Sequence, residues 1–308
     1  TRHFGFLNLT PRAGYRGTYY SETFSSETVT NQIVNTDSNG VVTVEDEVVT
    51  NTIEEGADLR NVYELGFETS FKAFRAWEDL IVLNDGDGLR HVVEPYLRHT
   101  YIPEPNLLPE QLPQFDSVDQ VNETHTLRLG VRNKLQTRRE TVPVDFVNVN
   151  LYTDYRIEKL EEQEDFSDLF FDVELRLSKR VPVDFDGAYD SYESEFSRFN
   201  AQAAYLADDM TRFGLDYAYT RDNFNQAGVS MSLFPNATWS FETYARWDME
   251  GEGLQEHSYL IQRRTRCLGY GFGFRQIVKD EEEEEDENVF WVQLWLMAMP
   301  ESAVQIGG

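Results

Sequence analysis

The sequence predicts an all-β protein, an antiparallel transmembrane β-barrel. Between breaks rich in Gly, Pro and acidic residues, the chain is a series of segments of about ten residues in which apolar and polar residues alternate, as in 170–179, 211–220 and 226–234. Successive strand residues point to opposite faces of a sheet, so each segment has one apolar and one polar face. No amphipathic pattern of helical period interrupts the series. Such repeated alternation is what a barrel needs to meet lipid outside and water inside.

The composition agrees with this fold class. The chain of 308 residues is 40% hydrophobic and 14% aromatic, which is too rich for a disordered chain, yet its net charge is −28. A barrel reconciles these values, because only alternate residues face lipid while the loops are polar. No run of about 18 apolar residues is present, so no transmembrane helix is expected. The negative charge also argues against a nucleic-acid partner.

About fourteen strands are expected from the alternation and the turn signals. Their cores are residues 4–9 with 13–20, 62–74, 91–102, 124–134, 144–156, 170–179, 182–190, 198–206, 211–220, 226–234, 238–248, 256–265, 268–278 and 289–299. The last strand is therefore expected at 289–299, with residues 300–308 extending beyond it.

The connections between these strands alternate in length. Long connections are expected at 21–59, 103–122, 158–169, 190–197, 250–255 and 279–288, and short ones at 180–181, 207–210, 235–237 and 266–267. Bacterial outer-membrane barrels have short periplasmic turns and longer extracellular loops, so the long side is predicted to be extracellular. Only the turn 77–88 is long on the short side. A soluble antiparallel sandwich is the alternative, although it would not be expected to sort its loops by side.

Two strands near the end carry distinctive faces. Bulky residues at 268, 270, 272 and 274 alternate with Gly269, Gly271 and Gly273. Glycines on an inner face permit close approach of a ligand or another polypeptide, and a strongly bent strand is the alternative reading. In the last strand, Trp291, Gln293 and Trp295 lie on the face opposite to Phe290, Val292 and Leu294.

Nothing in the chain predicts an enzyme, a cofactor or a metal centre. No nucleophile-elbow, zinc-hydrolase, paired-cysteine or phosphate-loop motif is present. The acidic run 280–287 is expected to be a solvated loop, and a calcium or magnesium role is the alternative, without the fixed spacing of a dedicated site. Single Cys267 cannot form an internal disulfide. The five histidines are scattered, but His99 and His125 lie on neighbouring predicted strands.

The stretch 88–105, GLRHVVEPYLRHTYIPEP, resembles the LPS-assembly protein family, also called organic solvent tolerance proteins or LptD. His91, Glu94 and Pro95 match the family's His-x-x-Glu-Pro strand. Tyr101 and Pro103 follow as in its Tyr-x-Tyr-x-Pro segment, with His99 at the place of the first tyrosine. Residues 114–117 then supply the family's Asp-containing loop.

Later segments continue the resemblance in the same order. Asn133 and Leu135 match the family's Asn-Arg-Leu strand end, with Lys134 replacing Arg. Cys267 sits where the family has an adjacent cysteine pair, but Leu268 follows it. The last strand, 289–299, resembles the family's last strand. The similarity covers roughly residues 60–300, and the family's barrel is larger than the strands expected here.

The resemblance implies a function for the chain. Residues 1–308 are expected to be an outer-membrane β-barrel domain, the C-terminal portion of the family's barrel, without its periplasmic domain. It would insert lipopolysaccharide into the outer leaflet of a Gram-negative-type outer membrane. Partners would be lipopolysaccharide, outer-membrane lipids, a lipoprotein plug and periplasmic bridge proteins. The alternatives are a porin or small-solute channel and a barrel whose long loops bind at the surface.

The lipid would leave sideways through a weakly paired seam between the first and last strands. Pro11 is a candidate seam residue because proline lacks an N–H and removes a ladder hydrogen bond. Trp291, Gln293 and Trp295 are the candidates on the last strand. A bulge or turn at Pro11 is the alternative.

Overall fold

The computed structural model describes residues 2–36, 42–82, 86–116, 118–140, 142–159, 163–208, 210–234, 238–251, 253–279 and 286–306. Within these residues the regular elements are β-strands and one short 3₁₀ turn, η1 (Pro109–Gln111). In this part of the chain no helix is long and apolar enough to cross a membrane. Seventeen strands belong to one antiparallel sheet, while β3 and β4 form a separate two-stranded sheet.

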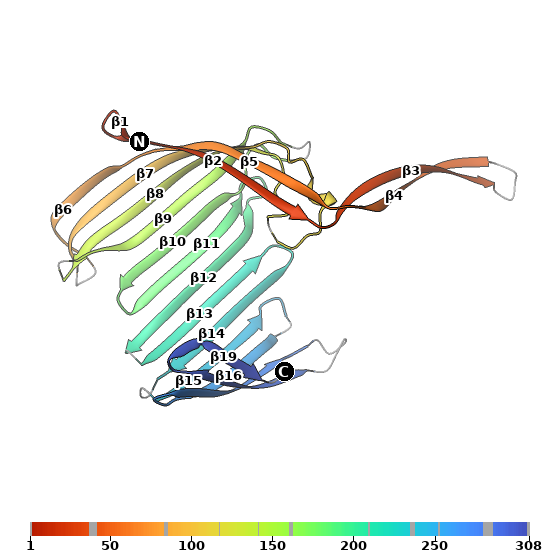
Figure 1. Ribbon diagram of the computed structural model, residues 1–308. Helices are drawn as coiled ribbons and strands as arrows, with labels where there is room; N and C mark the ends of the chain where they lie inside the picture. Colours follow the sequence, from red (N-terminus) through yellow and green to blue (C-terminus); the bar gives the residue numbers. More distant parts are fainter. Residues whose placement is uncertain are drawn as a thin grey trace. The chain divides into compact units, whose positions relative to one another are not determined.

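The second half of the chain is a meander in which each strand pairs with the next (Figure 1). Its strands are β10 (Leu169–Ser178), β11 (Val181–Asp190), β12 (Glu195–Asp208), β13 (Thr211–Thr220), β14 (Phe224–Leu233), β15 (Trp239–Asp248), β16 (Gly253–Arg264), β17 (Leu268–Ile277), β18 (Glu287–Leu296) and β19 (Met299–Ile306). Several of the connections are short turns, such as the one between β13 and β14, where Asp222 adopts a positive φ of 57°.

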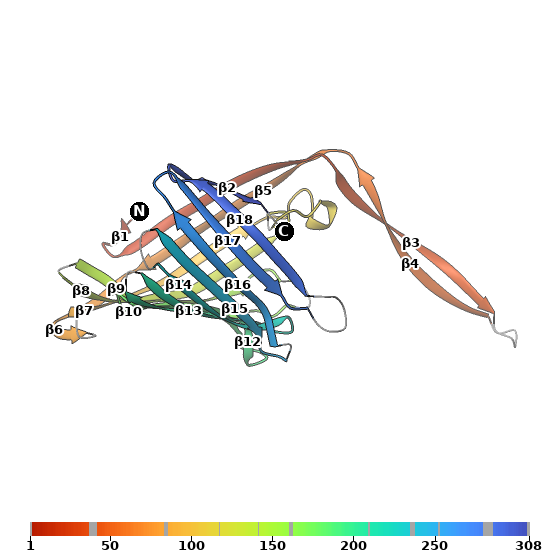
Figure 2. The same cartoon turned by 90° about the horizontal axis from the view of Figure 1, so that it is seen from below.

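The first half contains longer strands. They are β1 (Arg2–His3), β2 (Leu7–Tyr20), β3 (Thr23–Thr36), β4 (Val42–Glu55), β5 (Asp58–Phe71), β6 (Ala73–Val82), β7 (Gly86–Ile102), β8 (Thr124–Arg139) and β9 (Val142–Arg156). β5 and β6 both pair with β7 and are separated by Lys72 alone. Figure 1 and Figure 2 show the β3–β4 hairpin extending past the ends of β2 and β5.

The chain forms two compact units. Unit 1 comprises residues 1–70, 97–128 and 154–166, and unit 2 comprises residues 71–96, 129–153 and 167–308. A small apolar core in unit 1 consists of Tyr20, Leu107 and Leu112. Unit 2 is mainly sheet wall.

The structure confirms the all-β class and most expected strands. β13 has the expected bounds, and β10, β11, β14, β15 and β17 differ from expectation by one or two residues at an end. The long connection 103–122 is confirmed as the segment between β7 and β8. The short turn 235–237 and most of the acidic run 280–287 lie outside the described residues.

Three expectations about the chain's course were wrong. The connection 21–59 is largely the β3–β4 hairpin, because the alternation of this polar segment also suits a two-stranded ribbon. The turn 77–88 is not long: β6 continues to Val82 and β7 begins at Gly86, which removes the one exception to the loop pattern. Strand 289–299 is not the last, since β19 follows it and pairs with β18. The large antiparallel sheet agrees with the expectation of about fourteen strands, and the described residues add short strands such as β1 and β19.

Candidate functional site: the polar face of the wall

The alternation in unit 2 gives the wall an apolar outward face. Leu215 is 60% exposed, Phe272 55% and Phe290 67%, although all three lie inside paired strands. Their sequence neighbours point to the other side, because side chains alternate across a strand. Exposure of large apolar side chains in the middle of strands is what a lipid-facing surface requires.

The opposite face of unit 2 is polar and carries many carboxylates. Cross-strand pairs on this face are Asp172 with Asp186, Glu174 with Asp184, Asp184 with Gln202, Asp186 with Asn200 and Gln202 with Asp216. A cavity of about 500 Å³ lies against these strands and is lined by Asp184, Asp186, Asn200, Gln202, Asp216 and Tyr244, among others. The face therefore offers hydrogen-bond acceptors and amides at many neighbouring positions.

Cations offset part of this negative charge. Arg176 donates to Asp184, and Nη2 of Arg198 lies 3.6 Å from Oδ2 of Asp186. Asn200 donates to Asp186 at 3.1 Å. Carboxylates remain more numerous than cations among the residues that line the cavity, so it favours hydroxyl-rich or cationic groups over anions.

The family-motif residues of β7 and β8 meet in pairs. Nε2 of His91 lies 3.3 Å from Oδ1 of Asn133. Glu94 forms ion pairs with Lys72 at 3.4 Å and Arg132 at 3.5 Å. His91 and Glu94 differ in strand parity and so serve opposite faces of the sheet. Pro95 follows Glu94 within β7.

Arg132 on β8 also contacts Tyr96 on β7, and the sequence did not predict this contact. The guanidinium of Arg132 lies 4.0 Å from the ring centre of Tyr96, a cation–π contact. A Cβ at Gly130 would lie 2.4 Å from that ring, so only glycine leaves room for it. The Tyr96 hydroxyl donates to Asn150 at 3.1 Å. The glycine inside an alternating strand was the available signal.

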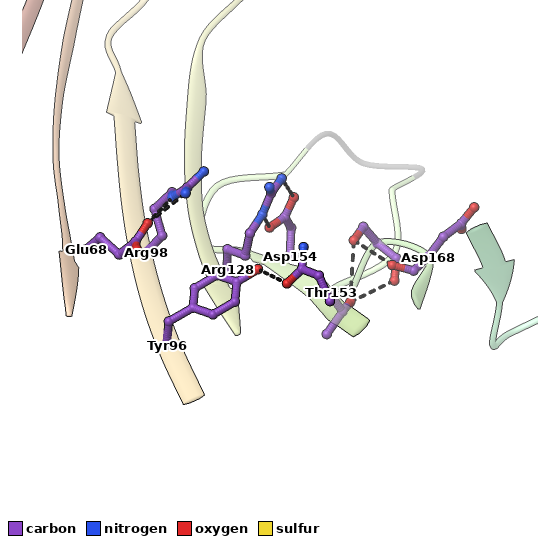
Figure 3. Close-up of polar contacts among 9 residues, drawn as sticks. Glu68, Tyr96, Arg98, Arg128, Thr153, Asp154 and Asp168 are labelled. Atoms are coloured by element: carbon purple, nitrogen blue, oxygen red, sulfur yellow. Dashed lines mark hydrogen bonds and ion pairs between the residues drawn. The ribbon is translucent and has the colours of Figure 1, made fainter. Parts of the chain in front are cut away.

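Unit 1 has its own charged pairs between neighbouring strands. Nε and Nη2 of Arg98 donate to Oε2 of Glu68 at 2.9 and 2.7 Å, and Arg128 binds both oxygens of Asp154 at 2.7 and 2.9 Å (Figure 3). The fork of a guanidinium matches a carboxylate in this way. Sequence reasoning missed both pairs, because their partners lie 30 and 26 residues apart.

The glycine face of β17 is occupied by the tryptophans of β18. Gly269 is opposite Trp295 and Gly273 is opposite Trp291. A Cβ at either glycine would come within 2.0 or 2.1 Å of the facing indole. The expectation of an open face for a ligand or another chain is therefore wrong at Gly269 and Gly273, where side chains of this protein fill the space.

The other candidate residues are placed as follows. Gln293 lies between the two tryptophans and accepts from Nε2 of Gln262 at 3.3 Å. Because β18 pairs with β17 and β19, these residues are not on an end strand. Pro11 lies inside β2, so a turn there is excluded. Cys267 is a free, exposed thiol in the turn between β16 and β17.

The loop between β7 and β8 is tied to β5 by a set of hydrogen bonds from one buried arginine. Arg60, only 1% exposed, donates to the carbonyls of Leu107, Val118, Asp119 and Val121. Asp119 in turn accepts from the hydroxyl of Tyr20 and from the backbone N–H groups of residues 115 and 116. These bonds hold the pKa of Asp119 below its ordinary value.

The sequence model of the family described as LPS transport system D, LptD, matches residues 1–251. The chain belongs to the LptD family. It is therefore a non-enzymatic lipopolysaccharide transport protein of the bacterial outer membrane, as its β7 and β8 motifs predicted. β16 to β19 and Cys267 lie beyond the matched residues.

Other comparisons add little to this assignment. No match was found among curated protein sequences. The fold is similar to a triple mutant of the Rhodopseudomonas blastica porin, with 9% identity, a TM-score of 0.40 and coverage of 97% of this chain and 92% of the porin. It is also similar to OccAB4 of Acinetobacter baumannii, with 9% identity, a TM-score of 0.38 and coverage of 92% and 78%. The family assignment does not depend on these likenesses.

Proposed function

We propose that this LptD-family chain releases lipopolysaccharide sideways into the outer leaflet through a seam between β18 and β19. The observation that carries the proposal is a difference between two adjacent ladders. β17 and β18 pair without a break from Leu268–Leu296 to Ile277–Glu287. The β18–β19 ladder has a register shift between Leu294 and Leu296. An irregular ladder has fewer good backbone hydrogen bonds to break.

The tryptophans favour opening on this side of β18. Trp291 and Trp295 fit against Gly273 and Gly269, which ties β18 to β17 by shape as well as by backbone bonds. Lipid cannot replace broken backbone bonds, so a seam should open where the ladder is already weak. β19 would then separate while β18 stays with the wall.

The polar face of unit 2 suits the sugar-bearing part of the lipid. Its carboxylates and amides, around the cavity of about 500 Å³, can accept from and donate to sugar hydroxyls. The acyl chains would pass directly to the apolar outward face. A lipoprotein plug and periplasmic bridge proteins are proposed partners of the same polar face. Transport of lipopolysaccharide along this face needs no cofactor and no covalent chemistry.

Pro11 is proposed to weaken the first long strand in a similar way. It lies well inside β2, which runs from Leu7 to Tyr20, and it has no N–H to donate. The ladder of β2 therefore lacks one donor at this position. Replacement by Val, which restores the N–H, should slow lipid export if β2 takes part in the seam.

A disulfide across the seam tests the proposal. Gln293 and Gln305 are Cα partners of β18 and β19. In a Cys267→Ser background, Gln293→Cys with Gln305→Cys should crosslink under oxidation and stop delivery of lipopolysaccharide to the cell surface. Reduction should restore delivery. Surface lipopolysaccharide on intact cells is the measurement.

A second pair provides the control. Thr243→Cys with Tyr259→Cys joins Cα partners in the regular part of the β15–β16 ladder and should crosslink without affecting delivery. If the crosslinked Gln293–Gln305 variant delivers lipopolysaccharide normally, the seam is not at β18–β19. Large single-channel conductance of the purified protein would then favour a porin-like channel.

A further inference from the structure

Two histidines in unit 1 face each other at close range. Nε2 of His99, on β7, lies 3.1 Å from Nε2 of His125, on β8, and the rings meet edge to face. His99 occupies the position where the family resemblance expects a tyrosine. The sequence placed the two residues on neighbouring strands but gave them no role, and the seam proposed above does not involve them.

Aromatic neighbours hold both rings in place. Phe67, on β5, stacks on His99 with ring centres 5.4 Å apart, and Tyr101 packs edge-on against His125 at 5.0 Å. Phe67 is 37% exposed and belongs to the outward face of β5, so the histidine pair lies on the apolar side of the sheet.

A carboxylate stands behind one of the rings. Oε1 of Glu158 lies 3.5 Å from Nδ1 of His125. The two atoms are not hydrogen-bonded in this geometry, and Nδ1 of His125 is buried without a hydrogen-bond partner among the described residues. A small movement of the exposed Glu158 side chain would let it accept from Nδ1–H, which leaves the Nε2 lone pair of His125 available, and a hydrogen bond of this kind commonly orients metal-binding histidines.

We propose that His99 and His125 form a binding site for a borderline divalent cation such as Zn²⁺. Two Zn–N bonds of about 2.0–2.1 Å at a tetrahedral angle place their nitrogens roughly 3.3 Å apart. The observed separation of 3.1 Å is close to this value, and each ring must turn so that its Nε2 lone pair points at the cation instead of at the other nitrogen. The cation takes the place of the proton between the two nitrogens, and that proton moves to Nδ1 of His99.

The donor set defines the class of cation. Imidazole nitrogen suits Zn²⁺, Cu²⁺ and Ni²⁺, whereas Ca²⁺ and Mg²⁺ prefer oxygen. Within the described residues no group of three or more His, Cys, Asp or Glu side chains is arranged to hold a metal. Among these residues the two imidazoles are the ligands of the proposed site. They lie close to the ends of β7 at Ile102 and β8 at Thr124, where water can complete the coordination.

Calorimetric titration of the full chain in detergent micelles with Zn²⁺ tests the site. Excess Ca²⁺ is present to occupy carboxylate oxygens, including those of the acidic run 280–287. One Zn²⁺ should bind per chain. His99→Gln and His125→Gln should each weaken binding at least tenfold, and Glu158→Gln severalfold. His257→Gln, which removes a histidine elsewhere, should bind as the original protein does.

A measurement on the unaltered protein guards against variants that fail to fold. Zn²⁺ should protect His99 and His125, but not His257, from acylation by diethyl pyrocarbonate, as read by mass spectrometry. Absence of stoichiometric Zn²⁺ binding, unchanged binding in both His→Gln variants, or unprotected His99 and His125 would overturn the proposal. Because these readouts do not involve lipid export, they are independent of the proposed seam.

Discussion

The wall of β10 to β18 and the loop 103–122 keep their structures by different means. In the wall, each residue repeats a rule of alternation, and cross-strand partners such as Leu215 and Val229 resemble many others along the sheet. The loop instead depends on one buried side chain of β5, Arg60, which donates to four of its carbonyls. The wall should therefore tolerate changes that keep the pattern, whereas the loop should depend on single residues.

The largest effect is expected at Arg60. Arg60→Ala leaves the carbonyls of four loop residues without their charged donor, and hydrogen bonds to charged groups contribute about 1.5–3 kcal/mol each. We expect a loss of about 4 kcal/mol or more in local stability, measured as rapid proteolysis within 103–122. Arg180→Ala, in an exposed turn, should be cleaved there no faster than the original protein. Equal resistance of both variants would contradict the contrast between loop and wall.

The wall should respond to a break in its alternation. Leu215→Arg places a charge on the outward face, which costs about 2–4 kcal/mol near the membrane midplane. Asp216→Arg, one residue later, points toward the polar cavity and should cost much less. Unfolding from detergent or lipid vesicles by urea measures both. Equal losses would mean that the two faces have been confused.

β17 is the strand of the wall whose stability should depend on single residues, as that of the loop depends on Arg60. Gly269→Ala and Gly273→Ala each place a Cβ within about 2 Å of an indole, and overpacking of this kind costs about 1–3 kcal/mol. Gly271→Ala is the matched control, since its nearest neighbour is Cγ of Gln262 at 3.1 Å, in a flexible side chain. Urea unfolding should rank Gly271→Ala as the mildest change. The same rank for all three would remove the special role of the tryptophans.

The smallest effect is expected from acid at the loop. The bonds from Tyr20 and the backbone lower the pKa of Asp119 in the folded protein. A group with a depressed folded pKa stabilises the fold above its ordinary value, about 3.9 for Asp, and this stabilisation is lost as the pH falls through the folded value. Loop proteolysis should therefore be constant near neutrality and increase below about pH 4. The difference from Asp119→Asn should vanish in strong acid, and a constant difference at all pH values would contradict the assignment.

Much of the fold followed from local pattern. The alternation around Leu215 and Val229 placed β13 and β14 and their outward faces, because period-two patterning needs no knowledge of the partner strand. The motif of β7 and β8 identified the family. The alternation did not predict the structure where a segment also suited a loop or a tail. This was so for the polar β3–β4 hairpin and for β19, which follows β18 after a short turn.

By itself the sequence determined the all-β class, the two faces of most strands and the membership of a lipopolysaccharide transport family. The tertiary structure decided which distant side chains meet. It matched Trp291 with Gly273, gave Arg60 its four carbonyls and brought His99 to His125. Alternation is a property of one strand, whereas these contacts depend on register between strands and on the path of a loop. A change of one residue in the strand register or in the path of the loop would leave the alternation of the sequence intact but would break these contacts.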